Sequence, residues 1–326
     1  MSIDPLLVRA RGLWEDVASA PISFASDGGV RVVVSPESGM CPAGWVGVVT
    51  LGGSAIVTAP NEDAASIVRD ALAGLPVEAV AAAGAVRGVL SVARVLGPAA
   101  LAYVSADGFR PLKPGVLTVE QLPGEHPDLR SLEKLAGEED AGETGLEEIT
   151  SPAFVLRKDG QVVAAAGYRV WPSRTAHISV LTAPAWRGRR LARAAGSATT
   201  AHALAAGLLP QWRARVPASR RVALALGFRE LGAQLSIELA YAQCSQGRQP
   251  VPAAPANTPG KDGSGRFSLR TMRRRLVLAA ARSSLGLVTR SFSCAGGTGC
   301  KGPASRTGGP GGGAAQGLVR PRNRRR

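Results

Sequence analysis

The stretch that decides the fold runs over residues 175–206 and reads TAHISVLTAPAWRGRRLARAAGSATTAHALAA. Its first part, residues 175–182, mixes β-branched, apolar and small polar residues, which is typical of a half-buried strand. A short loop over residues 183–187 follows, and the Ala-rich run over residues 190–206 predicts a helix that Gly207 closes. The segment therefore predicts a strand, a basic turn and a long helix in direct succession.

The basic turn stands where the predicted helix begins. Its cations are Arg187, Arg189, Arg190 and Arg193. Between Ala185 and Arg221 the sequence holds eight arginines and no acidic residue. Backbone N–H groups at a helix N-terminus lack intrahelical partners, and the helix dipole favours an anion there. We therefore expect this turn to bind a polyanionic small ligand, such as a cofactor that carries a pyrophosphate.

The elements expected around this segment alternate between strands and helices. Strands are predicted at residues 153–157, 161–170, 210–216 and 233–239, and a short helix at residues 218–226. Asp159 and Gly160 form a tight-turn signal between the first two strands, and Ser219 suits the N-cap of the short helix. From residue 151 onward the predicted order is β-β-β-α-β-α-β.

The N-terminal part also reads as α/β. Short Val-rich strands flank Gly52 and Gly53, a hairpin signal, and Asn61 is expected to cap a helix. A second helix is predicted over residues 82–96. The polar stretch at residues 123–150 has an acidic excess; we interpret it as a solvated helix and loop, with an acidic rim that attracts an amine substrate as the alternative.

The basic turn resembles a known signature. Arg187-Gly188-Arg189-Arg190-Leu191-Ala192 is similar to Gln/Arg-x-x-Gly-x-Gly/Ala, the acetyl-CoA motif of the GCN5-related N-acetyltransferase (GNAT) superfamily, and Leu226-Gly227-Phe228 resembles a second family motif. The chain departs from the family pattern at three places. Arg190 replaces the central glycine, Val216 stands where many relatives carry Asn, and Ala223 where a tyrosine often protonates the departing thiolate.

The resemblance implies an α/β (α+β) fold with a mixed, mainly antiparallel GNAT-type sheet flanked by helices and preceded by a smaller α/β domain. We expect the N-terminal domain at residues 1–125, the acetyltransferase domain at 126–240 and a basic tail rich in Gly, Pro and Arg, without fixed structure, at 241–326. The N-terminal domain is expected to be a degenerate GNAT-like half, a wall of the cleft or a dimer surface.

The resemblance also implies the reaction, in which an acetyl group moves from acetyl-CoA to the primary amine of a small molecule or a protein. It places the cofactor against Leu181, Thr182, Arg187, Gly188, Arg189, Arg190, Leu191 and Ala192. The candidates for the catalytic base are His177, whose ordinary pKa suits the task, and Glu148. Core packing of the histidine and solvation of the glutamate are the alternatives. A non-catalytic acyl-CoA-binding regulator is the alternative function.

Charge and composition limit the other function classes. The formal charge is +15, but residues 1–240 hold 23 basic and 23 acidic residues, so the whole excess lies in the tail. Nucleic acid is therefore expected as a partner only through that tail, which also resembles an unselected reading frame after about Leu239.

No run reaches the roughly 20 apolar residues of a membrane span, and no secretory signal is visible. We expect a cytoplasmic protein, with a homodimer as one assembly option. With three histidines and four scattered cysteines, no metal site is expected.

Overall fold

The computed structural model describes residues 4–113 and 117–240. In the first range the elements are α1 (Pro5–Val17), β1 (Gly29–Val34), β2 (Val46–Leu51), β3 (Ser54–Ala59), α2 (Glu62–Leu72), η1 (Val77–Ala79), α3 (Ala83–Val89) and β4 (Val92–Tyr103). In the second range the strands are β5 (Glu120–Leu122), β6 (Ala153–Lys158), β7 (Gln161–Trp171), β8 (Thr175–Thr182), β9 (Leu209–Ala214) and β10 (Arg229–Leu239). Its helices are α4 (Pro127–Ala136), α5 (Glu138–Thr144), η2 (Leu146–Glu148), η3 (Pro184–Trp186), α6 (Leu191–Ala205) and α7 (Pro217–Ala225).

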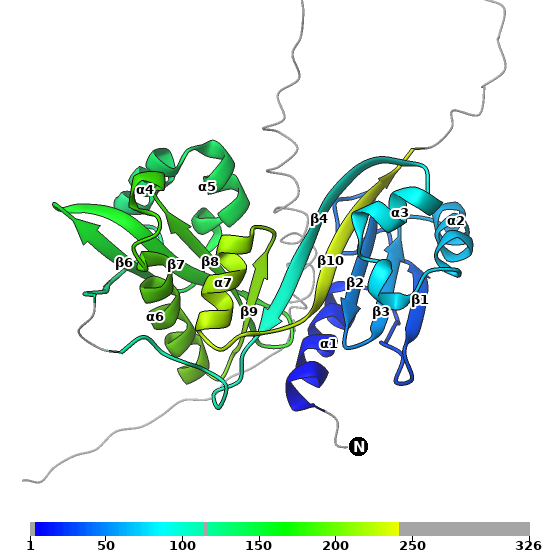
Figure 1. The fold of residues 1–326 in the computed structure, drawn as a ribbon, viewed down its shortest axis with the longest axis horizontal. Helices are drawn as coiled ribbons and strands as arrows, with labels where there is room; N and C mark the ends of the chain where they lie inside the picture. The colour runs from blue at the N-terminus through cyan, green and yellow to red at the C-terminus, as the bar shows by residue number, and fades with distance from the viewer. Residues whose placement is uncertain (1–3, 114–116, 241–326) are drawn as a thin grey trace, which may run out of the picture. The chain divides into compact units, whose positions relative to one another are not determined.

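All the strands of the described residues join one sheet in the order β1-β3-β2-β10-β4-β9-β8-β7-β6-β5. The pairs β1–β3 and β8–β9 are parallel, and the remaining pairs are antiparallel. The predicted mixed, mainly antiparallel sheet with flanking helices is confirmed. The last strand, β10, lies between β2 and β4 (Figure 1), so strands from both ends of the described chain interleave. The boundary at residues 125 and 126 stays a prediction.

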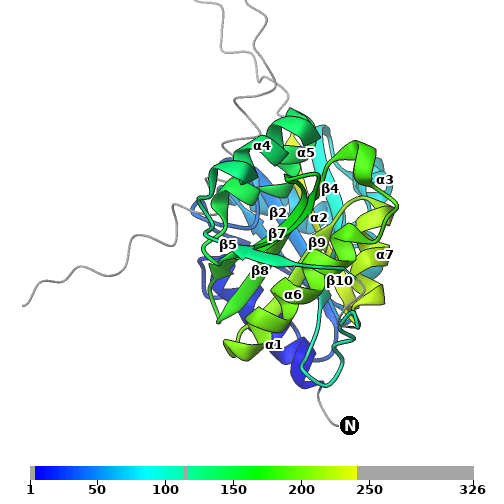
Figure 2. The same cartoon turned by 90° about the vertical axis from the view of Figure 1, so that its left-hand side faces the viewer.

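Helices cover both faces of this sheet. Alternate residues at the end of β4 and directly after it show the division: Leu101 and Tyr103 pack in a cluster with α1, while Ala102 and Val104, the residue that follows β4, pack in a cluster with α6 and α7. Farther along, α4 packs on one face of β6 and β7 and α6 on the other. Figure 2 shows α4 above and α6 below the edge strand β5. The sheet is therefore the middle of three layers, and its side chains form core on both sides.

Two local features differ from the prediction. Helix α1 was not predicted, although Asp4 caps it by accepting from the Leu6 N–H at 3.0 Å and Pro5 opens it. The predicted helix over residues 82–96 is wrong beyond Val89, because β4 begins at Val92 and continues through Pro98. Proline is tolerated there because β9 pairs with β4 only from Ala100 onward, so the edge that faces β9 needs no N–H donor at that point.

The pairing of β8 with β9 leaves an opening in the sheet. These strands pair only where residues 175–177 face residues 209–211. Beyond that point β8 stays with β7 as far as Thr182, while β9 turns to β4 as far as Ala214. The two strands therefore separate, and the edge of β8 that faces β9 has backbone groups without sheet partners.

Several expectations fall outside what the structure describes. The tail at residues 241–326 belongs to the parts that are left undescribed. A strand is also predicted from the sequence at residues 116–122, and its first residue, Val116, lies outside the described residues. Among the described residues, no helix combines the length and the apolar character that crossing a membrane requires.

Candidate active site

A cavity of about 750 Å³ occupies the opening between β8 and β9. Consecutive residues of a strand point to opposite faces of the sheet. Both sets of β8 side chains nevertheless line the cavity: His177, Ser179 and Leu181 from one face, and Ile178, Val180 and Thr182 from the other. The cavity therefore reaches both faces through the separated strands, and its volume lies in the range of small-molecule sites.

One end of the cavity is built by the turn before α6, which we call the turn lobe. Its cavity-lining residues from the turn are Leu181, Thr182, Trp186, Arg187, Gly188, Arg190, Leu191, Ala192 and Arg193, and those from α7 are Ala218, Ser219, Arg221, Val222 and Ala225. Gly188 and Arg190 have positive φ angles of 77° and 65°, and Arg190 is the N-cap of α6. Arg190 thus adopts the left-handed conformation that glycine reaches without strain. The departure from the family motif is a backbone strain as well as an added cation.

Most of the predicted cofactor-binding residues come together in the turn lobe. Those that line the cavity are Leu181, Thr182, Arg187, Gly188, Arg190, Leu191 and Ala192. Arg189 does not line it; its guanidinium carbon lies 4.6 Å from the ring centre of Trp186, a cation–π contact. Trp186 therefore supports the turn from one side and also faces the cavity.

Polar groups in the turn lobe are only partly satisfied. Arg187 Nη2 lies 2.6 Å from Asp140 Oδ2, an ion pair with α5. Among the described residues, Arg190 and Arg221 line the cavity without an ion pair. The buried Thr182 Oγ1 has no hydrogen-bond partner in the described part of the chain. The lobe therefore offers positive charge and a spare polar atom to a ligand.

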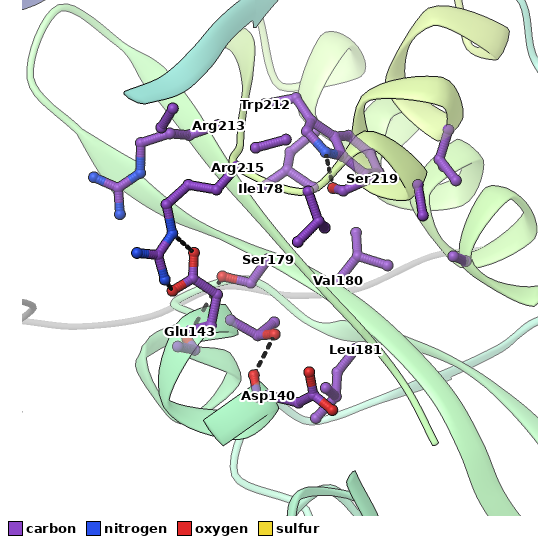
Figure 3. Close-up of a pocket in the computed structure, with 18 of the residues that line it drawn as sticks. Asp140, Glu143, Ile178, Ser179, Val180, Leu181, Trp212, Arg213, Arg215 and Ser219 are labelled. Atoms are coloured by element: carbon purple, nitrogen blue, oxygen red, sulfur yellow. Dashed lines mark hydrogen bonds and ion pairs between the residues drawn. The ribbon is translucent and has the colours of Figure 1, made fainter. Parts of the chain in front are cut away.

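The acidic helix α5 supplies carboxylates that pair with Arg187 and Arg215. Arg215 Nε donates to Glu143 Oε1 at 2.7 Å. This is a second ion pair with α5, besides the pair of Arg187 with Asp140. Figure 3 shows Asp140 and Glu143 on α5 facing the opening of the sheet. Helix α5 has no buried residue, as expected for a solvated helix. Its carboxylates also pair with cations on the cavity wall, so this part of the acidic stretch is not a free rim.

The other end of the cavity, which we call the inner lobe, contains further charged groups. Its lining residues are Glu148, Arg169, Trp171, His177, Arg213, Gln234 and Ser236, with Met40, Cys41, Leu96 and Gly97 from the N-terminal half. Glu148 Oε2 accepts from Arg169 Nη1 at 2.9 Å. Burial raises the pKa of the Glu148 carboxyl, and the nearby charge of Arg169 opposes that rise.

His177 lies in the inner lobe with its imidazole held on two sides. Its ring stacks on Trp171 with centroids 4.2 Å apart, and its Nδ1 is 2.8 Å from Gln211 Oε1. An amide oxygen only accepts, so Nδ1 carries the proton and Nε2 keeps its lone pair. Burial, reinforced by the charge of Arg213, lowers the pKa of His177 to about 3. The imidazole is therefore neutral near pH 7 and a weak base.

A buried chain of hydrogen bonds extends from His177 toward α1. Gln211 Nε2 donates to Tyr103 Oη at 3.0 Å, and Trp14 Nε1 donates to the same oxygen at 2.7 Å. None of these three side chains is accessible to solvent. The chain fixes the amide of Gln211, which in turn fixes the tautomer of the imidazole.

Some residues singled out in the sequence have other roles. The prediction for Ser219 is wrong: α7 has Val216 at its N-cap, and Ser219 Oγ accepts from Trp212 Nε1 at 2.9 Å. Val216 lines the cavity, whereas Ala223 is buried in the core. No cluster of three or more metal-ligating side chains occurs within residues 4–113 and 117–240.

Arg213, Gln234 and the lining residues of the N-terminal half, such as Met40, were not predicted from the sequence. Arg213 follows Gln211 by two positions, so the period of a strand would have placed both on one face. Gln234 and Met40 gave no comparable signal. They meet only because β10 enters the sheet beside β2, an arrangement set by tertiary packing.

Comparisons with known proteins find a family match within the described residues. Residues 151–233 match the family model described as GNAT acetyltransferase, and no curated protein matches the chain. The chain is similar to a GNAT-family protein from Novosphingobium aromaticivorans (25% identity, TM-score 0.36, covering 45% of this chain and 65% of that one). It is also similar to a GCN5-related N-acetyltransferase from Kribbella flavida (19% identity, TM-score 0.35, covering 44% and 58%). In both cases it spans less than two thirds of the other protein's length.

Proposed function

We propose that this protein, whose residues 151–233 match the GNAT acetyltransferase family model, moves an acetyl group from acetyl-CoA to a primary amine. The observation that carries the proposal is the cavity through the open sheet, which has spare positive charge at one end and the carboxylate of Glu148 at the other. The choice between a small-molecule and a protein amine, and assembly as a homodimer, stay predictions of the sequence.

The turn lobe suits acetyl-CoA by the chemistry of its donors. The first N–H groups of α6, at Leu191 and Ala192, and the guanidinium of Arg190 would hold the phosphates. The unpaired edge of β8 and the spare hydroxyl of Thr182 would bind the amide-containing arm. When bound there, acetyl-CoA supplies an activated acetyl thioester.

Of the two candidate bases, Glu148 has the pKa that suits a base better. Its pKa is raised toward the working pH range, whereas His177, with a pKa of about 3, holds a proton too weakly. In the reaction the amine nitrogen bonds to the acetyl carbon, the carbon–sulfur bond breaks, and Glu148 takes the proton that the amine loses. The departing thiolate takes its proton from water, because Ala223 has no hydroxyl to give. The role of His177 is then to shape the inner lobe.

A non-catalytic acyl-CoA binder is the second candidate, and the methyl side chain of Ala223 favours it. The two candidates are separated by calorimetric binding of acetyl-CoA and by release of free thiol with a panel of amines. We expect binding together with thiol release that depends on the amine. Binding with no release above background for any amine would leave the regulatory function in its place.

A further inference from the structure

Arg213 is a cation in the inner lobe without an anionic partner. It comes from β9 and lines the cavity, and among the described residues no carboxylate lies within ion-pair distance of it. Its neighbours differ: Arg169 pairs with Glu148, and Arg215 pairs with Glu143. Figure 3 shows Arg213 and Arg215 extending from the same strand, with dashed contacts to Glu143 from Arg215 only.

The guanidinium of Arg213 is oriented by a neutral side chain. Its Nη1 donates to Gln234 Oε1 at 3.2 Å, and Gln234 Nε2 donates to the backbone oxygen of Met40 at 2.6 Å. The N-terminal half and β10 therefore position this arginine together. Gln234 uses one of five guanidinium N–H groups, so a fork of donors remains for a ligand.

Arg213 keeps its charge and free donors exposed at the cavity surface. Arg213 is exposed to the cavity. The protein around it lowers the pKa of the guanidinium, and the charge of Glu143 opposes that change. Arginine nevertheless stays charged in proteins. A planar guanidinium with free N–H groups matches a carboxylate by two parallel hydrogen bonds. Recognition of a carboxylate would use the charge that the fold otherwise leaves uncompensated.

The inner lobe thus presents opposite charges to a single occupant. Glu148 and Arg213 do not pair, yet each charge acts on the pKa of the other group and opposes the shift that burial causes. His177, which lines the same lobe, is neutral. We propose that the acceptor is a small amino acid-type molecule, whose carboxylate pairs with Arg213 while its amine faces Glu148. This inference rests on the proposed acetyl transfer and names the substrate class.

The size of the cavity favours a free small molecule over a protein. The cavity of about 750 Å³ must hold both the thioester end of acetyl-CoA and the acceptor. Met40, Leu96 and Gly97 wall the inner lobe from the N-terminal half. A lysine side chain or a protein N-terminus carries no free carboxylate near its amine and would leave Arg213 unpaired.

The test compares carboxylates with their neutral amides. Thiol release is measured with acetyl-CoA and leucine, phenylalanine, leucinamide or phenylalaninamide, for the wild type, Arg213→Gln and Arg213→Lys. We expect the wild type to prefer the two amino acids by at least about tenfold in kcat/KM, in line with a lost charge-assisted contact. Arg213→Gln should raise KM for the amino acids and leave the amides unchanged, and Arg213→Lys should lie between the two. Arg87→Gln, an exposed change outside the cavity, is the control.

Each outcome has a distinct meaning. Equal turnover of acids and amides by the wild type, or a preference that survives Arg213→Gln, overturns the carboxylate site while leaving acetyl transfer intact. If thiol is not released with any of the amines, the proposed acetyl transfer is overturned. Calorimetric binding of leucine to the CoA-loaded protein then tests the carboxylate site at Arg213 separately. Leucine binding that Arg213→Gln abolishes supports the carboxylate site, and absence of binding to the wild type overturns it. Unfolding temperatures of the variants check that each one folds.

Discussion

Replacing Tyr103 by Phe removes one oxygen atom on which two buried donors depend. Trp14 Nε1 and Gln211 Nε2 both donate to Tyr103 Oη, and all three side chains are inaccessible to water. Phenylalanine fills nearly the same volume, so the change leaves two unsatisfied donors and almost no cavity. Each unsatisfied buried donor costs about 1–3 kcal/mol. We therefore expect Tyr103→Phe to lower the free energy of unfolding by about 2–5 kcal/mol.

The assay is thermal and urea unfolding followed by circular dichroism. For a body of this size each 1 kcal/mol corresponds to roughly 2–4 °C in Tm, so the expected decrease is about 4–20 °C. Tyr168→Phe is the matched control, because the Tyr168 hydroxyl contacts one side-chain atom, His202 Nδ1, at 3.0 Å. That variant should lose about 1 kcal/mol. A Tm for Tyr103→Phe within 1 °C of the wild type, or equal losses in both variants, would refute the buried chain as described.

Three further predictions concern the site and the sheet. Glu148→Gln should lower kcat about 100-fold or more at unchanged Tm. In the wild type the rate should rise as Glu148 loses its proton, with a midpoint above the ordinary glutamate pKa because burial raises it; a pH profile identical in both proteins contradicts this. Arg190→Gly should weaken acetyl-CoA binding in calorimetry without lowering Tm, since glycine adopts a φ of 65° freely; unchanged affinity excludes the guanidinium from cofactor binding. Gly232→Ala should prevent stable folding, because its Cβ would lie 1.7 Å from the backbone oxygen of Thr50. A soluble variant that unfolds cooperatively would argue against the pairing of β10 with β2.

The parts of the fold that depend on neighbours in sequence could be predicted. The strand, turn and helix at residues 175–206 are confirmed because periodicity, the basic turn and Gly207 are local signals. Asn61 caps α2 as expected, accepting from the Ala64 N–H at 2.9 Å. The β2–β3 hairpin at Gly52 and Gly53 is confirmed for the same reason.

The parts that depend on distant partners could not be predicted. Residues 90–96 carry a helix-like pattern, yet they pair with β10, whose sequence lies more than 130 residues away. The charge of Arg187 and Arg215 reads as free in the sequence, but Asp140 and Glu143 on α5 neutralise it. Contacts of this kind are set by sheet order, which local propensity does not encode.

The pairing of individual charged side chains, and not the net charge of the protein, determines which cations of the cavity are available to a ligand. Residues 1–240 are neutral overall, yet the cavity wall carries cations of two kinds. Those that face α5 are matched by carboxylates, whereas Arg190 in the turn lobe and Arg213 in the inner lobe are left for ligands. An exposed pair contributes at most about 1 kcal/mol to stability, so the α5 pairs are better explained as shielding. By neutralising Arg187 and Arg215, these pairs leave the attraction for anions to cations such as Arg190 and Arg213. A phosphate would bind at the first and a carboxylate at the second, with an acetyl group between them.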